Sequence, residues 1–265
     1  MRKILWRMWQ VTWAEQWQYR GNLLTYALYG LISPIVFLSV WRTIAASQGG
    51  VNGLTANDFT AYYLILLLVD TLTSEITLQL LAHKIQDGSL SGELLLPVHP
   101  VLTRALVNNL ANKVLIFIAL LPVWGVLVLL FRPDFSGVTP FHLVLALVAM
   151  GIGFVIHFLL GALITCAGFW ITRVYALSQF IYAFATLLGG AFVPLTLLPD
   201  FVQPVAQFLP FQLYLYFPIE LILGKLDPRQ IGLDFGLQAA WLLGLSLAFL
   251  GVWRAGLRRF SAVGA

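Results

Sequence analysis

Three ionisable side chains, Asp70, Glu75 and Lys113, lie within long apolar stretches, where a charge is costly to bury and usually serves a function. Glu75 precedes Lys84 by nine residues, and Lys113 follows Arg104 by nine. At about 1.5 Å per helical residue, both lie roughly 13 Å from the same end of two adjacent antiparallel helices. A buried Glu75–Lys113 ion pair is therefore predicted, either along a path for a transported molecule or only as a link between two helices. Asp70 lies deeper without a visible partner, so it would face a partner subunit or a water-filled cavity, or be protonated.

Patterns typical of enzymes and metal sites are absent from the sequence. The one Gly-Lys pair, Gly224-Lys225, is followed by Leu226 and lacks the glycine spacing of a phosphate-binding loop. Neither a His-Glu-x-x-His zinc motif nor a Gly-x-Ser-x-Gly nucleophile turn occurs. His157 is interpreted as a hydrogen-bonded packing residue and Cys166 as a small packing residue. We expect no catalytic residue, no metal site and no cofactor bound by this chain itself.

Composition indicates the solvent in which these residues are positioned. Of the 265 residues, 60% are hydrophobic and 10% are charged, whereas soluble domains carry about 25% charged residues. A bilayer core takes about 20 apolar residues per helix, and stretches such as 114–131 lack the alternation of a barrel strand. The prediction is an all-α polytopic membrane protein forming one domain, 1–265. Its six transmembrane helices are expected at about 22–46, 59–84, 104–131, 141–170, 174–196 and 232–256.

Residues 1–21 are predicted to form an interfacial amphipathic helix. Four tryptophans recur at spacings of three, four and four, which places them on one helical stripe suited to the headgroup level of membrane lipids. The alternative is that this segment is only the hydrated start of the first span. The proposed anchor residues are Trp6, Trp9, Trp13 and Trp17.

Residues 197–231 are predicted to form short helices at the outer face, or helices that dip partly back into the membrane. Four prolines exclude one straight helix, yet the segment is too apolar for a solvated loop. Charged residues such as Glu220 would hold its polar side in water.

The distribution of basic residues predicts the orientation. With both termini cytoplasmic, ten Lys and Arg residues lie at the inner side and four lie outside, and Lys113 is set apart as intramembrane. The net charge of +4 therefore reflects topology and gives no reason to expect nucleic acid as a partner.

The cytoplasmic connection 85–103 carries a family resemblance. Ile85-Gln86-Asp87-Gly88-Ser89-Leu90-Ser91 followed by Leu94-Leu95-Leu96-Pro97-Val98-His99-Pro100 resembles the first cytoplasmic loop of type-2 ATP-binding-cassette exporter permeases. A second similarity, to the glycine-ended fifth span and proline-rich outer segment of that family, lies at Gly189-Gly190, Phe192, Pro194, Leu198-Pro199, Leu209-Pro210-Phe211 and Pro218. The similar tetrapeptide Leu90-Ser91-Gly92-Glu93 matches the signature loop of the ATPases by coincidence, since the phosphate-binding loop is missing.

The resemblance implies a permease subunit of an ATP-driven exporter in a bacterial inner membrane. Two separate ATPase subunits would bind ATP and Mg²⁺ and push the loop's short coupling helix, so that a drug-like compound, a lipid or a lipid-linked glycan is moved outward. Leu90, Leu94 and Leu95 are expected to offer an exposed apolar face to the ATPase. The coupling residues implied are Asp87, Gly88, Ser89, Leu90, Ser91, Gly92, Glu93, Leu94, Leu95 and Pro97.

Two positions depart from the family pattern. Leu96 stands where Arg is common, and Glu93 stands where an aromatic residue is common, which favours a second, related permease chain as partner over an identical copy. The alternative function is an ion- or proton-coupled secondary transporter that uses Asp70 and Glu75, although no internal repeat or pair of broken helices is visible.

Overall fold

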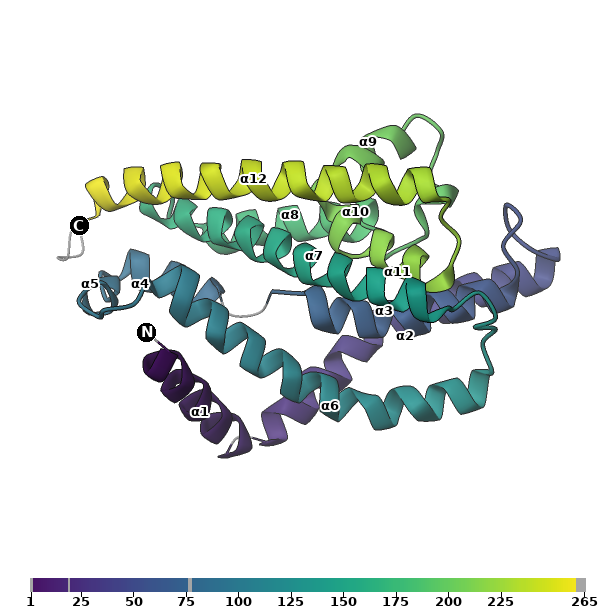
Figure 1. Ribbon diagram of the computed structural model, residues 1–265, viewed down its shortest axis with the longest axis horizontal. Helices are drawn as coiled ribbons and strands as arrows, with labels where there is room; N and C mark the ends of the chain where they lie inside the picture. The colour runs from purple at the N-terminus through teal and green to yellow at the C-terminus, as the bar shows by residue number, and fades with distance from the viewer. Residues whose placement is uncertain (1, 19, 76–77, 261–265) are drawn as a thin grey trace.

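The computed structural model describes residues 2–18, 20–75 and 78–260, and within them the chain is helical with no strand. Figure 1 shows that both termini and the short helix α5 (Leu90–Leu94) lie toward one end of the molecule. The turn after α2 (Arg20–Gln48), the link between α6 (Leu106–Phe131) and α7 (Pro140–Cys166), and α9 (Gln203–Phe208) lie toward the other end. The predicted all-α fold is confirmed.

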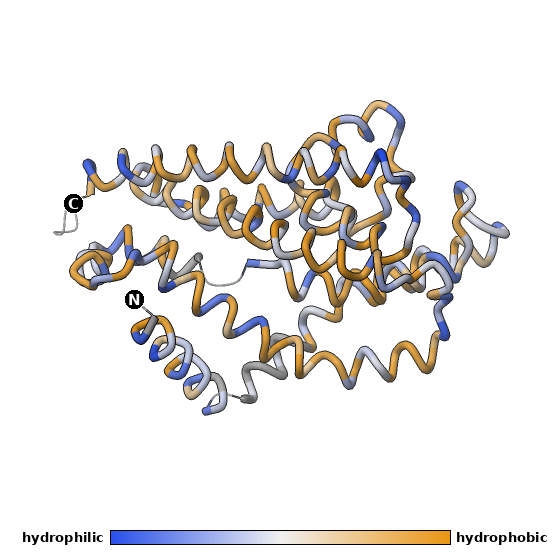
Figure 2. Tube along the Cα trace, viewed as in Figure 1, coloured by the Kyte–Doolittle hydropathy of each residue, from blue (hydrophilic) through white to orange (hydrophobic). Residues whose placement is uncertain are grey.

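The longer helices follow the apolar stretches of the sequence (Figure 2) and begin where local chemistry favours a helix. Thr55 and Asp58 form a capping box at the start of α3 (Ala56–Thr73). Thr139 and Asp227 cap α7 and α12 (Pro228–Arg259), each of which begins with a proline. Proline is favourable at this position, because an N–H group in the first turn of a helix would have no intrahelical acceptor and proline has no N–H.

Four helical stretches in the described residues are long and apolar enough to cross a membrane: 28–48, 100–131, 140–169 and 228–259. The second of these joins the π-helix η1 (Pro100–Ala105) to α6, and the third ends in the 3₁₀ turn η2 (Ala167–Phe169). The other two expected spans correspond to α3 with α4 (Leu78–Gln86), and to α8 (Val174–Leu188), which are shorter. A multi-pass membrane protein is thus supported, and the count of six spans stays a prediction.

Two expected spans differ from the sequence prediction. The span expected over 59–84 is interrupted, because α3 ends at Thr73 and Ser74 continues in an extended conformation; residues 76–77 lie outside the described part. The helix in the span expected over 174–196 ends at Leu188, and the chain turns at Gly190, whose φ is +92°. Glycine is needed at this turn, because a Cβ there would lie 2.6 Å from the Tyr62 hydroxyl.

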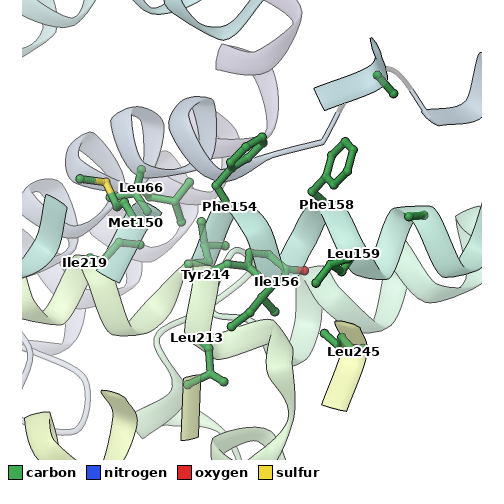
Figure 3. Packing of buried hydrophobic residues seen from close by; sticks show 14 of the residues in the cluster. Leu66, Met150, Phe154, Ile156, Phe158, Leu159, Leu213, Tyr214, Ile219 and Leu245 are labelled. Atoms are coloured by element: carbon green, nitrogen blue, oxygen red, sulfur yellow. The ribbon is translucent and has the colours of Figure 1, made fainter. Parts of the chain in front are cut away.

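The core lies around α7, as Figure 3 shows for Phe154, Phe158, Ile156 and Leu159. Phe154 and Phe158 lie on one side of this helix, and Ile156 lies on the side of Leu213. The backbone of the segment that follows α9 approaches α7 closely, because a Cβ at Gly153 would lie 2.8 Å from the Tyr214 Cα. The close approach of the two backbones and the packing of the aromatic rings together hold the segment around Tyr214 against α7.

The segment 197–231 forms short helices; the part around residues 210–223 packs inside the helical bundle, whereas Phe201, Val205 and Phe208 are exposed. Besides the 3₁₀ turn η3 (Leu195–Leu197) and α9, it contains α10 (Pro210–Tyr214) and α11 (Tyr216–Leu223), whose side chains are largely buried. Gln238 of α12 donates to the carbonyls of Ala149 and Leu213 at 2.9 and 2.8 Å, which ties α10 to α7. The expectation that Glu220 lies in water was wrong, because that side chain is buried.

The N-terminal helix α1 (Arg2–Gln18) packs against α6. The Thr12 hydroxyl lies 2.8 Å from Asn108 Oδ1, and the rings of Trp9 and Trp13 stack with centroids 6.1 Å apart. Trp6 and Trp17 are exposed. A position of this helix at a lipid interface stays a prediction.

Candidate functional site

The first part of the site is the interruption after α3. Ser74 N–H donates to the Asp70 carbonyl at 2.8 Å and ends the helix, while Ser74 itself is extended. A helix that ends within an apolar bundle leaves carbonyl groups that need partners from elsewhere. Two side chains, one from α6 and one from α7, serve as these partners.

Lys113 of α6 is the first partner. Its ammonium donates to the Thr71 carbonyl at 3.2 Å and to the Ser74 hydroxyl oxygen at 3.3 Å, and it lies 5.2 Å from the centre of the Phe154 ring. Only 3% of the residue is exposed. A cation here is favourable because the C-terminal end of a helix carries partial negative charge.

His157 of α7 is the second partner. Its Nδ1 lies 3.1 Å from the Thr73 carbonyl oxygen, so this nitrogen carries the proton in the contact, because a carbonyl only accepts. The imidazole stacks on the Tyr214 ring, with centroids 4.1 Å apart and planes inclined by 17°. The interpretation of His157 as a hydrogen-bonded packing residue is confirmed.

Glu75 and Lys113 belong to the same cluster. Glu75 Oε1 lies 3.5 Å from the Asn109 amide nitrogen, and Lys113 interacts electrostatically with both Glu75 and Asp70. The sequence spacing therefore correctly predicted that the segment around Glu75 lies beside the helix that carries Lys113. Direct ion pairing between Glu75 and Lys113 stays a prediction. The hydrogen bonds of Lys113 to the end of α3 were missed, because the polar run 70–75 was not interpreted as a break in the helix.

A cavity of about 440 Å³ lies beside this interruption. Asp70 and Glu75 contribute to its wall together with side chains from α2, α7, α8 and α10. Asp70 lies deep in the protein and yet keeps partial exposure, because it faces this space. Of the three alternatives for Asp70, the one in which it faces a cavity agrees with this geometry; whether that cavity holds water, and the other two alternatives, stay predictions.

The second part of the site is the connection between α4 and α6. Gly88 has a φ of +80°, which allows the tight turn after α4. Hydrogen bonds from the hydroxyl and backbone N–H of Ser89 to the Asp87 carboxylate lower the pKa of Asp87. A helix of five residues, α5, follows, and the Ser91 hydroxyl donates to the Gly88 carbonyl at 2.9 Å. The helix covers only part of the implied coupling residues, which run from Asp87 to Pro97.

Glu93 fixes α5 to the helices on both sides of it. Its carboxylate accepts from Lys84 of α4 and lies 3.3 Å from an Arg104 nitrogen of η1. The Glu93 side chain is largely buried, whereas its two partners are partly exposed. Glu93 thus joins the two ends of the loop. The sequence analysis missed this role. The available signal was an acid in the loop with one basic residue in each adjoining helix, Lys84 and Arg104.

The exposed apolar surface of the loop differs from the expected one. Leu90 is fully buried, so the expectation that it contributes to an exposed face was wrong. Leu94, Leu95 and Leu96 are exposed, and Leu95 is the most accessible at 88%. Pro97 and Leu96 also line a groove between this loop and α1.

His99 ends the loop and starts the next helix. Its Nδ1 accepts from the N–H groups of Val101 and Leu102 at 3.2 and 3.1 Å, and its ring packs on Trp253 of α12. Burial lowers the pKa of His99. The neutral imidazole needed to accept these two bonds is thereby favoured, and the loop is held against α12.

The comparison with known families decides what kind of protein carries this loop and this cavity. The profile of the family described as ABC-2 family transporter protein matches residues 31–264. The chain belongs to the ABC-2 transporter family. An ABC-2 protein is the membrane part of a transporter, which agrees with the resemblance found in the loop and with the apolar helices. Among curated proteins, none matches the chain.

Proposed function

We propose that this ABC-2 protein is the permease subunit of an ATP-driven exporter of hydrophobic or amphiphilic molecules. Two separate ATPase subunits bind ATP and Mg²⁺, and a second permease chain, preferably a related one, completes the transporter. We propose six spans in a bacterial inner membrane, with both termini on the cytoplasmic side because most basic residues then lie inside.

The observation that carries the proposal is the form of the loop around α5. Three consecutive exposed leucines, 94–96, lie at the same end of the molecule as both termini (Figure 1). Exposed leucines are unfavourable in water unless a partner covers them. Glu93 holds this surface to α4 and η1, so a force applied to α5 reaches the second and third expected spans directly.

The same end of the molecule contains the connection between α7 and α8. Gln86 at the end of α4 donates to the Thr172 carbonyl at 2.9 Å. Movement of the loop therefore also bears on α8, whose side chains line the cavity. This link supports a mechanism in which closure of the ATPases changes access to the cavity between inward-open and outward-open states.

The proposal is tested by isolating the tagged chain from its native membrane in mild detergent. We expect an ATP-binding-cassette ATPase to be retained, and inside-out vesicles containing the complex to accumulate substrate only when ATP is present. Transport by the reconstituted chain alone, driven by an ion gradient without any ATPase, would contradict the proposal and favour the secondary transporter.

A further inference from the structure

The cavity beside the end of α3 has the size and wall of a binding site. Its volume of about 440 Å³ falls in the range of small-molecule pockets, roughly 300–1,000 Å³. Leu160, Ile164 and Phe211 supply apolar surface, and Ser178 and Gln179 supply polar groups. The wall therefore suits a molecule that has both an apolar body and a polar head.

Asp70 is an acid of this wall that no hydrogen bond within the described residues satisfies. Among the residues that the structure describes, no side chain or N–H group donates a hydrogen bond to the Asp70 carboxylate, and no ion pair reaches it. The nearby ammonium of Lys113 donates instead to the Thr71 carbonyl and the Ser74 hydroxyl. A carboxylate left in this position has to take up a proton or meet a cation, because an uncompensated buried charge is costly.

The charges around the cavity favour a cation as ligand. Two carboxyl groups, Asp70 and Glu75, belong to the cavity wall, and one ammonium, Lys113, lies nearby. Lys113 is not part of the cavity wall, whereas both acids are. A positive charge placed in the cavity would therefore face carboxyl groups directly, and an anion would be repelled.

Aromatic rings strengthen this preference. Tyr29 of α2 and Tyr182 of α8 both belong to the cavity wall and remain 75% and 66% exposed, which shows that the cavity is open on their side. The faces of such rings carry partial negative charge and attract organic ammonium groups. The Nδ1–H of His157, which also lines the cavity, donates to the Thr73 carbonyl.

We infer that this cavity binds the positively charged head of an amphiphilic organic cation, with the Asp70 carboxylate as its counter-charge. The inference rests on the proposed transport function and narrows its substrate class. Glu75 contributes negative charge at the rim, and the apolar wall holds the body of the molecule. A neutral or anionic amphiphile of equal size would bind much more weakly.

The test uses the purified full-length chain in lipid nanodiscs, without ATP or an ATPase. Tetraphenylphosphonium and tetraphenylborate serve as probes, because they share shape and hydrophobicity and differ in the sign of the charge. We expect the phosphonium to bind at least about tenfold more tightly than the borate, and Asp70→Asn to remove most of this difference. Asp70→Glu should retain it, and Asp200→Asn, which removes an exposed carboxylate elsewhere, should leave it unchanged.

The inference fails if the borate binds the wild-type chain as tightly as the phosphonium, or if Asp70→Asn keeps the preference. If Asp70→Asn does not fold, a wild-type background carrying Ser178→Cys gives the answer. The phosphonium should then slow maleimide labelling of the cavity wall and the borate should not; equal effects would overturn the inference. Because the assay needs no ATPase, a negative result here leaves the proposed transporter function intact.

Discussion

Lys113→Met should release the end of α3 while keeping the volume of the side chain nearly constant. The substitution removes two hydrogen bonds from an ammonium, each worth about 1.5–3 kcal/mol, and a contact with the Phe154 ring worth about 0.5–2 kcal/mol. It also removes the cost of burying the ammonium, which offsets part of that loss. We therefore expect the free energy of unfolding to fall by about 2–3 kcal/mol.

The assay is reversible unfolding in mixed micelles with increasing sodium dodecyl sulfate, followed by tryptophan fluorescence. Lys225→Met is the matched control, because Lys225 pairs with Asp58 at 3.1 Å but both side chains are about one-third exposed. Partly exposed ion pairs contribute about 0–1 kcal/mol, so this control should change stability little. A loss below about 0.5 kcal/mol for Lys113→Met would refute the role of Lys113 at the helix end.

The double variant Glu75→Gln with Lys113→Met tests the predicted ion pair. If the two groups interact, the double variant should lose about 1 kcal/mol less than the sum of the two single variants. Additive losses would show that Glu75 and Lys113 act independently.

Three further changes test other parts of the structure. Glu93→Gln removes the charge that holds α5 to both neighbouring helices and should cost about 1–2 kcal/mol, measured by the same unfolding assay, because its basic partners are partly exposed; an unchanged midpoint would contradict this joint. Gly190→Ala should destabilise the chain by at least about 1 kcal/mol, since its φ is +92° and a Cβ would lie 2.6 Å from the Tyr62 hydroxyl, and wild-type stability would argue against this turn. For topology, a cysteine at Lys3 should be labelled only from the cytoplasmic side and one at Asp200 only from outside; the reverse pattern in intact cells would refute the orientation.

The positions of the long helices could be predicted because apolar length, capping residues and prolines are all local signals. The short helices between Pro194 and Gly224 follow from such signals, whereas α12 begins at Pro228, four residues before the expected span. The end of α3 was not predicted, because the sequence around Thr73 contains neither proline nor glycine; the polar run 70–75 was the available signal. That interruption depends on partners from α6 and α7, which lie far away in the sequence.

In the candidate site, too, local sequence signals were predictive and long-range packing was not. Asp70, Glu75 and Lys113 stood out because charges are rare in apolar stretches, and the structure places them in one region. The burial of Leu90 could not be foreseen, because the loop also contains leucines at 94–96 and only tertiary packing decides which of the four faces inward. Glu93 was interpreted as a departure from a family pattern, whereas its contacts with Lys84 and Arg104 give it a structural role.

The most direct test of the central claim, that ATP energy enters through the loop around α5, is ATPase retention and substrate-stimulated hydrolysis with Leu95→Glu. Leu95 is 88% exposed, and burying a leucine against a partner contributes about 1.5–3 kcal/mol. We therefore expect retention of the ATPase to fall roughly tenfold or more, with stimulation lost in parallel. Phe201→Glu is the control, because Phe201 is similarly exposed, at 81%, in the segment proposed to lie on the opposite side. Retention and stimulation equal to wild type in Leu95→Glu would contradict the account.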